Sequence, residues 1–354
     1  MWRAGRCSAA SWPKGLAERP REERRMMGTQ ERRLGARQEG FFSVALATLC
    51  TDALLEFDLY LPTAPSRAAV LYRERHLPFT NDARKRLVDH AISRLLVPKE
   101  QAEAYHAYLE ANLSAILANP RVPVEEKAGV LKTSAINIMK GVLSDPRAGV
   151  AFDRSQRLAQ TGITFIFSEP RALQNLVRLT SYDYYTYTHS VNVFLFSMAL
   201  AKNLGYQQRD VLAFGHGALL HDIGKCLIDP AILNHPGKLN EDQWREIKRH
   251  PINGYNILRK QGISAPETLD VARHHHERIT GKGYPDGLAG DQIPVFTRIA
   301  CVVDVFDALT TRRPYRDALD PAKAIALMND QMGKDFDPGV FRVFVRMMHQ
   351  RQVA

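Results

Sequence analysis

The sequence predicts a mainly α protein, with a helical bundle in the second half, preceded by a small α+β domain and a helical connector. Two observations carry this prediction. From residue 99 onward, apolar residues recur at steps of three and four, which is the spacing of one buried helix face. Before that point, short runs of strand-forming residues are separated by prolines, which is typical of a small α+β unit.

Residues 1–38 are predicted to be a basic, disordered tail. They contain nine arginines and one lysine against four glutamates, so they carry +6 of the net charge of +10. A charge excess of this kind is typical of a solvated, disordered segment. Because only +4 belongs to the rest of the protein, nucleic acid is not expected as a partner.

Residues 39–97 are predicted to form the small α+β domain. Strand-like runs cover 42–49, 55–61 and 68–72, and a helical pattern follows at 81–95. Residues 98–167 are predicted to be a helical connector, with two helices expected between residues 123 and 160. A homodimer through these N-terminal helices is a hypothesis.

Residues 168–354 are predicted to form one helix after another. Three aspartates stand directly before a proline, an arrangement that places an N-cap acceptor ahead of a proline in the first helical turn. These aspartates are Asp229, Asp320 and Asp337. Asn240 with Gln243 approximates a capping box at another helix start. Residues 280–294 contain four glycines and two prolines, so they are predicted to be a loop.

The chain is predicted to be cytoplasmic. Its four cysteines lie far apart without a CxxC pair, which indicates a reducing compartment and argues against a zinc ribbon or a disulfide framework. No apolar run follows the basic start, as a secretory signal would require. The longest apolar stretches, 41–50 and 191–200, are too short to span a bilayer, so no transmembrane segment is expected.

Five separated groups of histidine and aspartate in the second half are the candidate metal ligands. They are His189, His221 with Asp222, His250, His275 with His276, and Asp304. The 25 to 32 residues between successive groups fit one helix and a connection, so successive helices would bring the groups to one bundle interior. Nitrogen and oxygen ligands without thiolate favour Mn, Fe, Zn, Ni or Co over Mg or Ca.

Asp222 is predicted to bridge two cations, because a carboxylate can offer one oxygen to each. His221 and Asp222 are expected near a helix end, with Gly224 as the terminator. Two divalent cations would carry four positive charges, and Asp222, Asp304 and a bridging hydroxide would remove three. The remaining positive charge would attract a phosphodiester and stabilise the charge added to phosphorus. Lys225 is placed to hold a phosphate oxygen or to protonate the leaving alkoxide.

Other histidines lack such neighbours and are expected to be structural or exposed. These are His216, His235 and His274.

Together, the motifs resemble the HD-GYP family. The likeness covers about residues 170–350, and the motifs stand in the order and spacing of that family. They are His189, His221-Asp222-Ile223-Gly224-Lys225, His250-Pro251, His275-His276-Glu277-Arg278, Gly281-Lys282-Gly283-Tyr284-Pro285, Asp304-Val305-Phe306-Asp307-Ala308-Leu309 and Arg313-Pro314-Tyr315-Arg316.

The resemblance implies an HD-type helical bundle at 168–354 as the catalytic domain, and a sensory or regulatory role for 39–97. It implies a metal-dependent phosphodiesterase that hydrolyses cyclic di-GMP through pGpG to GMP by way of a bridging hydroxide. The seven candidate ligands would hold two divalent transition-metal ions, Fe or Mn first, with Zn, Ni or Co as alternatives. Asp222 and Lys225 would take part in catalysis.

The resemblance also implies which residues contact the substrate. They are Lys225, Gly283, Tyr284, Pro285, Arg313 and Arg316. The Gly-Tyr-Pro segment would shape the loop beside the site and offer a surface to signalling partners. The two arginines would face nucleotide phosphates, since a guanidinium can grip two phosphate oxygens at once. A salt bridge to the helix start at Asp320 is the structural alternative for them.

Two positions depart from the family pattern. Some members have a glutamate four residues before the first histidine and use it to hold a third metal, whereas this chain has Tyr185, so two metals are expected. The aspartate usual before the first loop glycine is Thr280, which bears on loop anchoring or nucleotide preference. Asp307 is expected either to hydrogen-bond a ligand or to serve its helix.

Two other functions stay open. The same chemistry could act on cyclic GMP-AMP, since the residues that select the base are not visible in the sequence. Alternatively, a catalytically weak domain could respond to cyclic dinucleotides as a scaffold. The complete ligand set disfavours the scaffold, because degeneration normally appears first as lost ligands.

Overall fold

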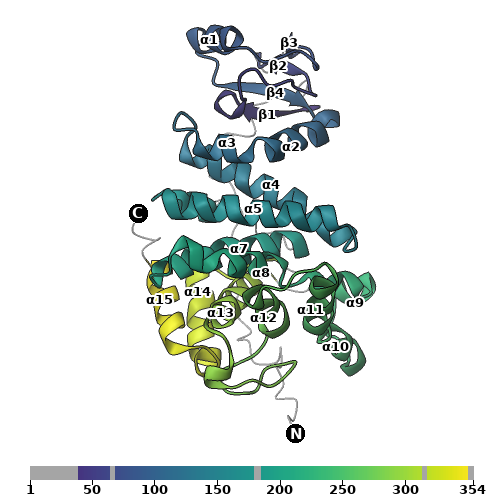
Figure 1. The fold of residues 1–354 in the computed structure, drawn as a ribbon, viewed down its shortest axis with the longest axis vertical. Helices are drawn as coiled ribbons and strands as arrows, with labels where there is room; N and C mark the ends of the chain where they lie inside the picture. Colours follow the sequence, from purple (N-terminus) through teal and green to yellow (C-terminus); the bar gives the residue numbers. More distant parts are fainter. Residues whose placement is uncertain (1–38, 64–67, 179–184, 313–316, 350–354) are drawn as a thin grey trace, which may run out of the picture.

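A computed structural model describes residues 39–63, 68–178, 185–312 and 317–349 (Figure 1). The predicted tail, residues 1–38, lies outside the described residues. So do Arg313 and Arg316, the two arginines expected to face phosphate. The small sheet lies at one end of the elongated molecule and the helical bundle at the other (Figure 1). The predicted fold class, mainly α with a small N-terminal α+β part, is confirmed.

The described N-terminal residues form a four-stranded antiparallel sheet in the order β1-β4-β2-β3. Its elements are β1 (Phe41–Ala45), β2 (Leu59–Leu61), β3 (Val70–Arg73) and β4 (Arg94–Pro98), with η4 (Leu46–Thr48) and α1 (Asn81–Asp89) between them. In the register of β1 and β4, Phe41 pairs with Pro98 and Ala45 with Arg94.

The helical pattern expected at 81–95 was wrong in its last part. The helix α1 ends at Asp89, and Ala91 takes a positive φ of 56° that turns the chain back. Residues 94–98 then form the strand β4 between β1 and β2, with Leu95, Leu96 and Val97 buried. Pairing on both edges of this strand outweighs the weak local helical signal.

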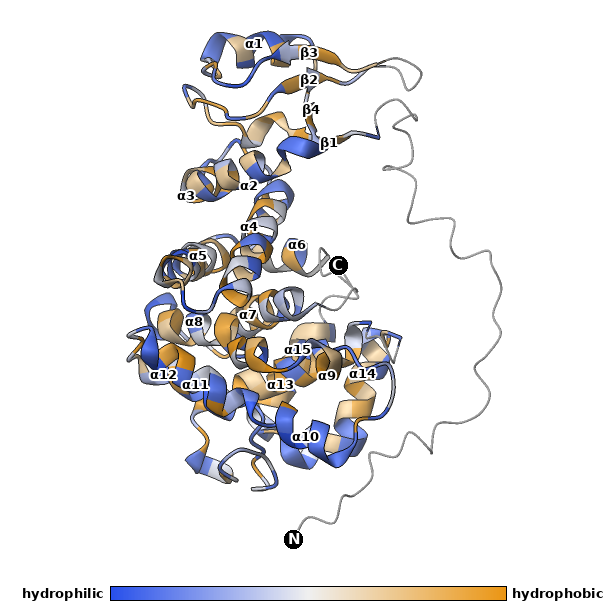
Figure 2. Ribbon diagram, turned by 90° about the vertical axis from the view of Figure 1, so that its right-hand side faces the viewer, coloured by the Kyte–Doolittle hydropathy of each residue, from blue (hydrophilic) through white to orange (hydrophobic). Residues whose placement is uncertain are grey.

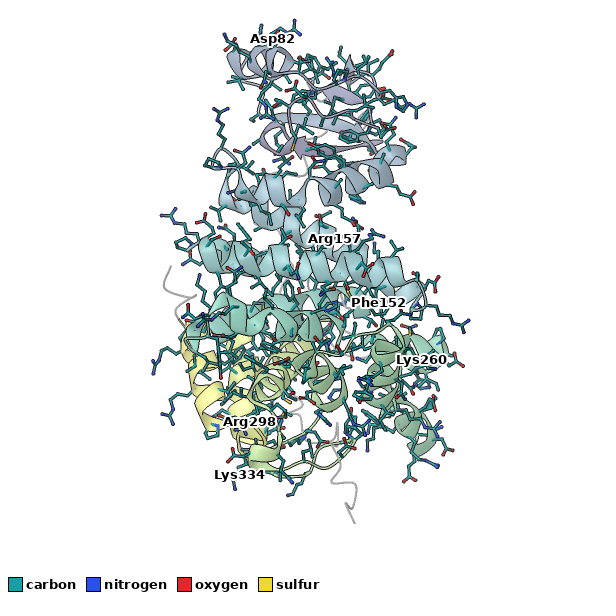
Figure 3. The ribbon with its side chains drawn as sticks, viewed as in Figure 1. Asp82, Phe152, Arg157, Lys260, Arg298 and Lys334 are labelled. Atoms are coloured by element: carbon teal, nitrogen blue, oxygen red, sulfur yellow. The ribbon has the colours of Figure 1, made fainter. Side chains whose placement is uncertain are left out.

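The connector consists of helices, as expected, and an aromatic cluster joins it to the sheet. The rings of Tyr105 and Tyr108 lie 5.3 and 5.5 Å from the ring of Phe57. The two helices expected between residues 123 and 160 are present as the long α4 and α5, and α5 packs on the bundle with Phe152 at that boundary (Figure 3). The connector elements are η5 (Lys99–Gln101), α2 (Ala102–Ala111), α3 (Leu113–Ala118), α4 (Val124–Ser144), α5 (Gly149–Ser168) and α6 (Ala172–Arg178).

The bundle is built from helices that start where the sequence indicates. The side chains of Asp229, Asp320 and Asp337 accept backbone N–H bonds at their helix starts, and Asn240 and Gln243 form a capping box. The elements are α7 (Thr186–Asn203), η6 (Gln208–Val211), α8 (Leu212–Leu220), η7 (Ile223–Leu227), α9 (Pro230–Leu233), α10 (Glu241–Ile247), α11 (His250–Lys260), α12 (Pro266–His274), η8 (Gly290–Gln292), α13 (Val295–Thr310), α14 (Pro321–Leu327), the π-helix η9 (Met328–Met332), η10 (Gly333–Asp335) and α15 (Pro338–His349).

The helices α7 and α13 form the centre of the bundle core. Phe194 on α7 and Phe306 on α13 are buried, together with Phe214 and Phe344 from the helices around them. Hydrophobic residues accordingly face the interior of the bundle (Figure 2). None of the helices in the described part of the chain combines the length and apolar character needed to cross a membrane. The apolar run at 191–200 is instead part of a core helix.

His216, expected to be structural, joins α8 to α5. Its Nε2 lies 2.9 Å from the hydroxyl oxygen of Ser155, which donates its own proton to the carbonyl of Phe152. The imidazole therefore donates through Nε2. Burial lowers the pKa of His216 to about 4, because the protonated ring would lose its hydration.

We predict that this histidine makes the folded protein acid-sensitive. Between pH 6.5 and 4 the unfolded chain binds a proton at His216 and the folded protein does not, so stability falls as the pH falls. The cost reaches about 2 kcal/mol at pH 5. His216→Gln keeps a donor for Ser155 but does not titrate. Urea unfolding at several pH values is expected to show a smaller loss in the variant, and parallel profiles would contradict the assignment.

Candidate metal centre

The seven predicted ligands converge in the interior of the bundle. His189 lies on α7 and Asp304 on α13, His221 and Asp222 follow the end of α8, His250 begins α11, and His275 and His276 follow the end of α12. Their donor atoms form three sets of three, each within 4.8 Å, and the set of His221, Asp222 and His275 links the two groups described below. The fold therefore brings together residues from five segments, as the spacing of one group per helix predicted.

The first group contains His189, His221 and Asp304. The Nε2 atom of His189 lies 3.2 Å from Nε2 of His221 and 3.0 Å from Oδ1 of Asp304. All three side chains are buried. Two imidazole nitrogens and a carboxylate oxygen thus point at a common centre.

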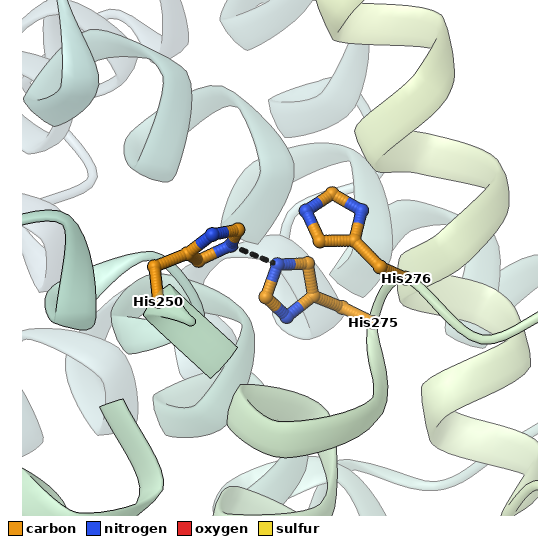
Figure 4. Close-up of side chains that lie close together, drawn as sticks. All are labelled: His250, His275 and His276. Carbon is orange, nitrogen blue, oxygen red and sulfur yellow. Dashed lines mark hydrogen bonds between the residues drawn. The ribbon is translucent and has the colours of Figure 1, made fainter. Parts of the chain in front are cut away.

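The second group contains His250, His275 and His276 (Figure 4). The Nε2 atoms of His250 and His275 lie 3.1 Å apart. The His276 ring lies with its centre 4.2 Å from that of His275 and 5.0 Å from that of His250. This second cluster offers nitrogen alone, so a cation there would depend on a neighbouring carboxylate for charge.

Asp222 lies between the two groups and faces each with a different oxygen. Its Oδ2 is 3.4 Å from Nε2 of His189 and 3.5 Å from Nε2 of His221. Its Oδ1 is 3.2 Å from Nε2 of His250 and 3.7 Å from Nε2 of His275. One carboxylate therefore serves both clusters.

The hydrogen bonds at the far side of the rings fix the protonation of the imidazoles. The Nδ1 atoms of His221, His250 and His275 lie 2.6 to 3.0 Å from backbone carbonyl oxygens, which can only accept. Each neutral ring therefore keeps its proton on Nδ1 and directs a bare Nε2 lone pair at the centre. Burial lowers the pKa of His250 and of His275, which favours these neutral rings.

Such an arrangement fits cations. Lone pairs on nitrogen atoms 3.1 to 3.2 Å apart repel each other unless a positive charge lies near both. Oδ1 of Asp222 is buried and has no hydrogen-bond donor in the described part of the chain. A buried acceptor without a donor is costly. Divalent transition metals would satisfy these acceptors at once, and imidazole with carboxylate is a donor set that suits them.

Both carboxylates of the centre are ionised at neutral pH. Burial opposes the charge on Asp222, but the ammonium of Lys225 outweighs it and holds the pKa of that carboxyl well below its usual range. The Nζ atom of Lys225 donates to Oδ2 of Asp222 over 2.5 Å. The pKa of Asp304 is also well below its usual range, although burial alone would raise it.

Asp307 holds the first ligand in place from behind. Its Oδ2 lies 2.7 Å from Nδ1 of His189 and accepts a bond from the Thr311 hydroxyl at 3.1 Å. Its Oδ1 accepts from Nδ2 of Asn192 at 2.8 Å. Of the two roles expected for Asp307, the structure shows the hydrogen bond to His189, a predicted ligand.

Gly224 permits the close approach of two ligand-bearing segments. It lies in η7 and does not have the positive φ of a helix terminator, so that expectation was wrong. A Cβ at this position would overlap the carbonyl oxygen of His250 and lie 2.5 Å from the backbone nitrogen of Gly254. The absent side chain lets α11 lie against the His-Asp segment, which brings His250 to Asp222.

The predicted Gly-Tyr-Pro loop lies against the second group of ligands. The ring of Tyr284 stacks on that of His276, with centres 4.8 Å apart and planes at 28°. Gly283 touches the main chain so closely that a Cβ there would overlap Glu277 and lie 2.5 Å from the nitrogen of Arg278. Pro285 follows in the same turn, through a cis peptide bond.

Glu277 anchors this loop, and the sequence reasoning missed its role. Its buried carboxylate accepts the backbone N–H groups of Asp286, Gly287 and Leu288 at 2.7 to 3.1 Å. The available signal was an acidic residue directly after two ligands and shortly before a glycine-rich loop. Thr280, the departure from the family pattern, bonds to Asp335 at 2.7 Å and so also ties the loop to the bundle.

The remaining predicted residues lie outside the two groups. Tyr185 caps α7, is 56% exposed, and stacks its ring on Tyr187. His274 pairs with Asp286 at the foot of the loop. His235 accepts a bond from the backbone of Gly237 at the surface. The structural or exposed roles expected for these histidines are consistent with these contacts.

Comparisons with known proteins identify relatives. A family model described as HD domain matches residues 164–340, half of the chain. Cyclic di-GMP phosphodiesterase PA4108 of Pseudomonas aeruginosa is 39% identical over 255 residues, which are 71% of this chain and 61% of that protein. The 3'3'-cGAMP-specific phosphodiesterase 3 of Vibrio cholerae is 39% identical over 166 residues, 47% of this chain and 36% of that protein. The chain thus spans less than two thirds of the length of these curated relatives.

A solved structure shares the fold. It is Bd1817, an HDG"Y"P protein from Bdellovibrio bacteriovorus, with a TM-score of 0.62 and 20% sequence identity. The match covers 87% of this chain and 99% of that one. Because the match extends beyond the bundle, it includes much of the connector and the N-terminal part.

We predict that Gly224→Ala loses most of its bound metal while remaining helical. The added methyl group must push α11 away from η7 and so separate His250 from Asp222. Gly129→Ala is the matched control, because nothing lies within 4 Å of a Cβ at that helical position. Metal content by elemental analysis and circular dichroism would be measured on both. A folded Gly224→Ala protein with full metal content would contradict the role of the close contact.

We predict that Asp307→Asn weakens metal binding by about 10- to 100-fold, the range typical when a partner behind a ligand is changed. The amide accepts less strongly from Nδ1 of His189 and so leaves that ring less well oriented. Competition with a chelator would measure the loss. Asp291→Asn changes an exposed aspartate that pairs with Arg298 and is expected to bind metal like the wild type. Equal chelator resistance in all three proteins would rule out this role.

Proposed function

The chain belongs to the HD domain family, and on that premise we propose that it is a metal-dependent phosphodiesterase that hydrolyses cyclic di-GMP to pGpG and GMP. The observation that carries the proposal is the pair of ligand groups that share Asp222. Adjacent cations held in this way are suited to an in-line displacement at phosphorus. The relatives named for this activity and the HD-GYP motifs of the sequence support the same substrate.

The proposed cofactors are two divalent transition-metal ions, Fe or Mn first, with Zn, Ni or Co as alternatives. His189, His221 and Asp304 would hold one, His250, His275 and His276 the other, and Asp222 both. When bound, the ions would supply a nucleophile from water near neutral pH and neutralise charge on the phosphate. The mixed nitrogen and oxygen donor set supports this choice of metals.

The protein's own residues would orient the ligands, bind the phosphate and form the wall of the site. Four of the five imidazoles are held through Nδ1 and keep the centre rigid, so little reorganisation would be needed during the reaction. Lys225 sits beside Asp222 with its ammonium 2.5 Å from the shared carboxylate. We propose that it holds a phosphate oxygen and favours departure of the alkoxide. Tyr284, stacked on His276, would form one wall of the site with Gly283 and Pro285.

Cyclic GMP-AMP is the second candidate substrate. The relative named as specific for 3'3'-cGAMP has the same 39% identity as the relative named for cyclic di-GMP, although over a shorter segment. Both dinucleotides present the same two phosphodiesters to the metals and differ in one base. Turnover of the two compounds measured side by side would decide between them.

The division of the chain stays a proposal: a tail at 1–38, a regulatory domain at 39–97, a connector at 98–167 and a catalytic domain at 168–354. A homodimer through the N-terminal helices, partner binding at the Gly-Tyr-Pro loop and a cytoplasmic location also remain predictions. Sedimentation of the purified protein would test the dimer.

We predict that Asp222→Ala abolishes hydrolysis of cyclic di-GMP while the protein stays folded, because both ligand groups lose their common carboxylate. The wild type, purified without oxygen, is expected to contain two equivalents of transition metal. Turnover would be followed by chromatography of pGpG and GMP. Asp82→Asn, an exposed change on α1 at the opposite end of the molecule (Figure 3), is the control and should retain full activity.

Undiminished hydrolysis by purified Asp222→Ala would contradict the proposed function. A wild-type protein that holds no metal and turns over neither dinucleotide would instead favour the scaffold that the sequence left open.

A further inference from the structure

At the end of α10, the C-cap residue Lys248 places a positive charge near the candidate site. This helix leads directly into His250, the first residue of α11, and its surface is hydrophilic (Figure 2). Two basic side chains of this segment are paired within it: Arg245 with Asp242, and Arg249 with Glu246 at 3.1 Å. No carboxylate oxygen of the described residues lies within 4.0 Å of the third, Lys248.

Lys248 reaches the Gly-Tyr-Pro loop instead. Its Nζ atom lies over the ring of Tyr284, 5.7 Å from the ring centre, which is a cation–π distance. Tyr284 in turn stacks on the predicted ligand His276 at 4.8 Å. These two distances together limit the separation of the ammonium group from the centre of the His276 ring to about 10.5 Å. Lys248 is therefore a cation at the rim of the metal centre.

An exposed aromatic ring lies on the same side of this segment. Trp244 is four residues before Lys248, so the two side chains share one helix face, and the backbone N–H of Lys248 bonds to the carbonyl of Trp244 at 3.0 Å. Trp244 is 48% exposed. An ammonium beside a flat apolar ring matches the chemistry of a nucleotide, which presents an anionic phosphate beside an aromatic base.

We propose that Lys248 is a substrate-binding residue that pairs with the phosphate of the cyclic dinucleotide not held at the ligand groups. This inference rests on the proposed function, because only a substrate with two phosphodiesters would reach both places. This pairing would hold the second nucleotide of the cyclic dinucleotide against the edge of the site, with its base toward Trp244. Lys248 would thereby favour cyclic dinucleotides over substrates with a single phosphodiester.

The test compares three variants on two substrates. Lys248→Met removes the charge and keeps the length of the side chain, and Lys248→Arg restores the charge. Arg249→Met is the control, because it removes a charge that is paired with Glu246 and directly precedes His250 in the sequence. Each protein, with its metal content verified, would be assayed on cyclic di-GMP and on bis(p-nitrophenyl) phosphate, which has one phosphodiester. The KM and kcat values would be determined separately.

Lys248→Met is expected to raise the KM for cyclic di-GMP about tenfold, the usual loss for a charge-assisted hydrogen bond. Its KM for bis(p-nitrophenyl) phosphate is expected to change less than its KM for the dinucleotide. Lys248→Arg should recover most of the loss, and Arg249→Met should stay within twofold of the wild type.

Hydrolysis of cyclic di-GMP by wild type and Lys248→Met with equal KM would overturn this inference and leave the proposed function intact. An equal rise in KM for both substrates, or the same rise in Arg249→Met, would also overturn it, because the effect would then be structural. A wild-type protein that hydrolyses bis(p-nitrophenyl) phosphate but no cyclic dinucleotide would overturn the proposed substrate and this inference together.

Discussion

Buried acceptors without donors are the constraint around which the bundle is organised. Bare Nε2 lone pairs and Oδ1 of Asp222 meet in the interior, where no hydrogen-bond donor of the described residues reaches that oxygen. Every contact behind them reinforces this arrangement: backbone carbonyls fix three imidazoles, and Asp307 fixes His189. An apolar replacement would pack more easily in such a core. Cations bound there would neutralise the converging acceptors, so the proposed function and the local architecture would depend on the same contacts.

Much of this site could be predicted from sequence, because ligand identity and helical spacing are local properties. Five groups separated by 25 to 32 residues imply one group per helix, and the aspartate-proline pairs mark where helices begin. The motifs also revealed the family. What sequence alone could not supply were contacts made by residues far apart. Glu277 appeared only as part of a motif, yet it binds three backbone N–H groups of a loop that begins several residues later.

The two errors have the same physical origin. The helical pattern at 81–95 was locally reasonable, but pairing with β1 and β2 made residues 94–98 a central strand. Gly224 resembled a helix terminator, but its lack of a side chain serves the approach of α11 to η7. In both cases a neighbour distant in sequence decided the outcome, and a one-dimensional pattern carries no information about that neighbour.

The candidate metal centre also links segments that lie far apart in the sequence. The predicted ligands come from five segments between residues 189 and 304, and two of those segments follow the ends of α8 and α12. Ion binding to the folded form alone adds stability by mass action. Loss of the proposed ions would therefore lower the stability of the bundle as well as remove the proposed activity, so that the supply of metal would affect the lifetime of the folded protein.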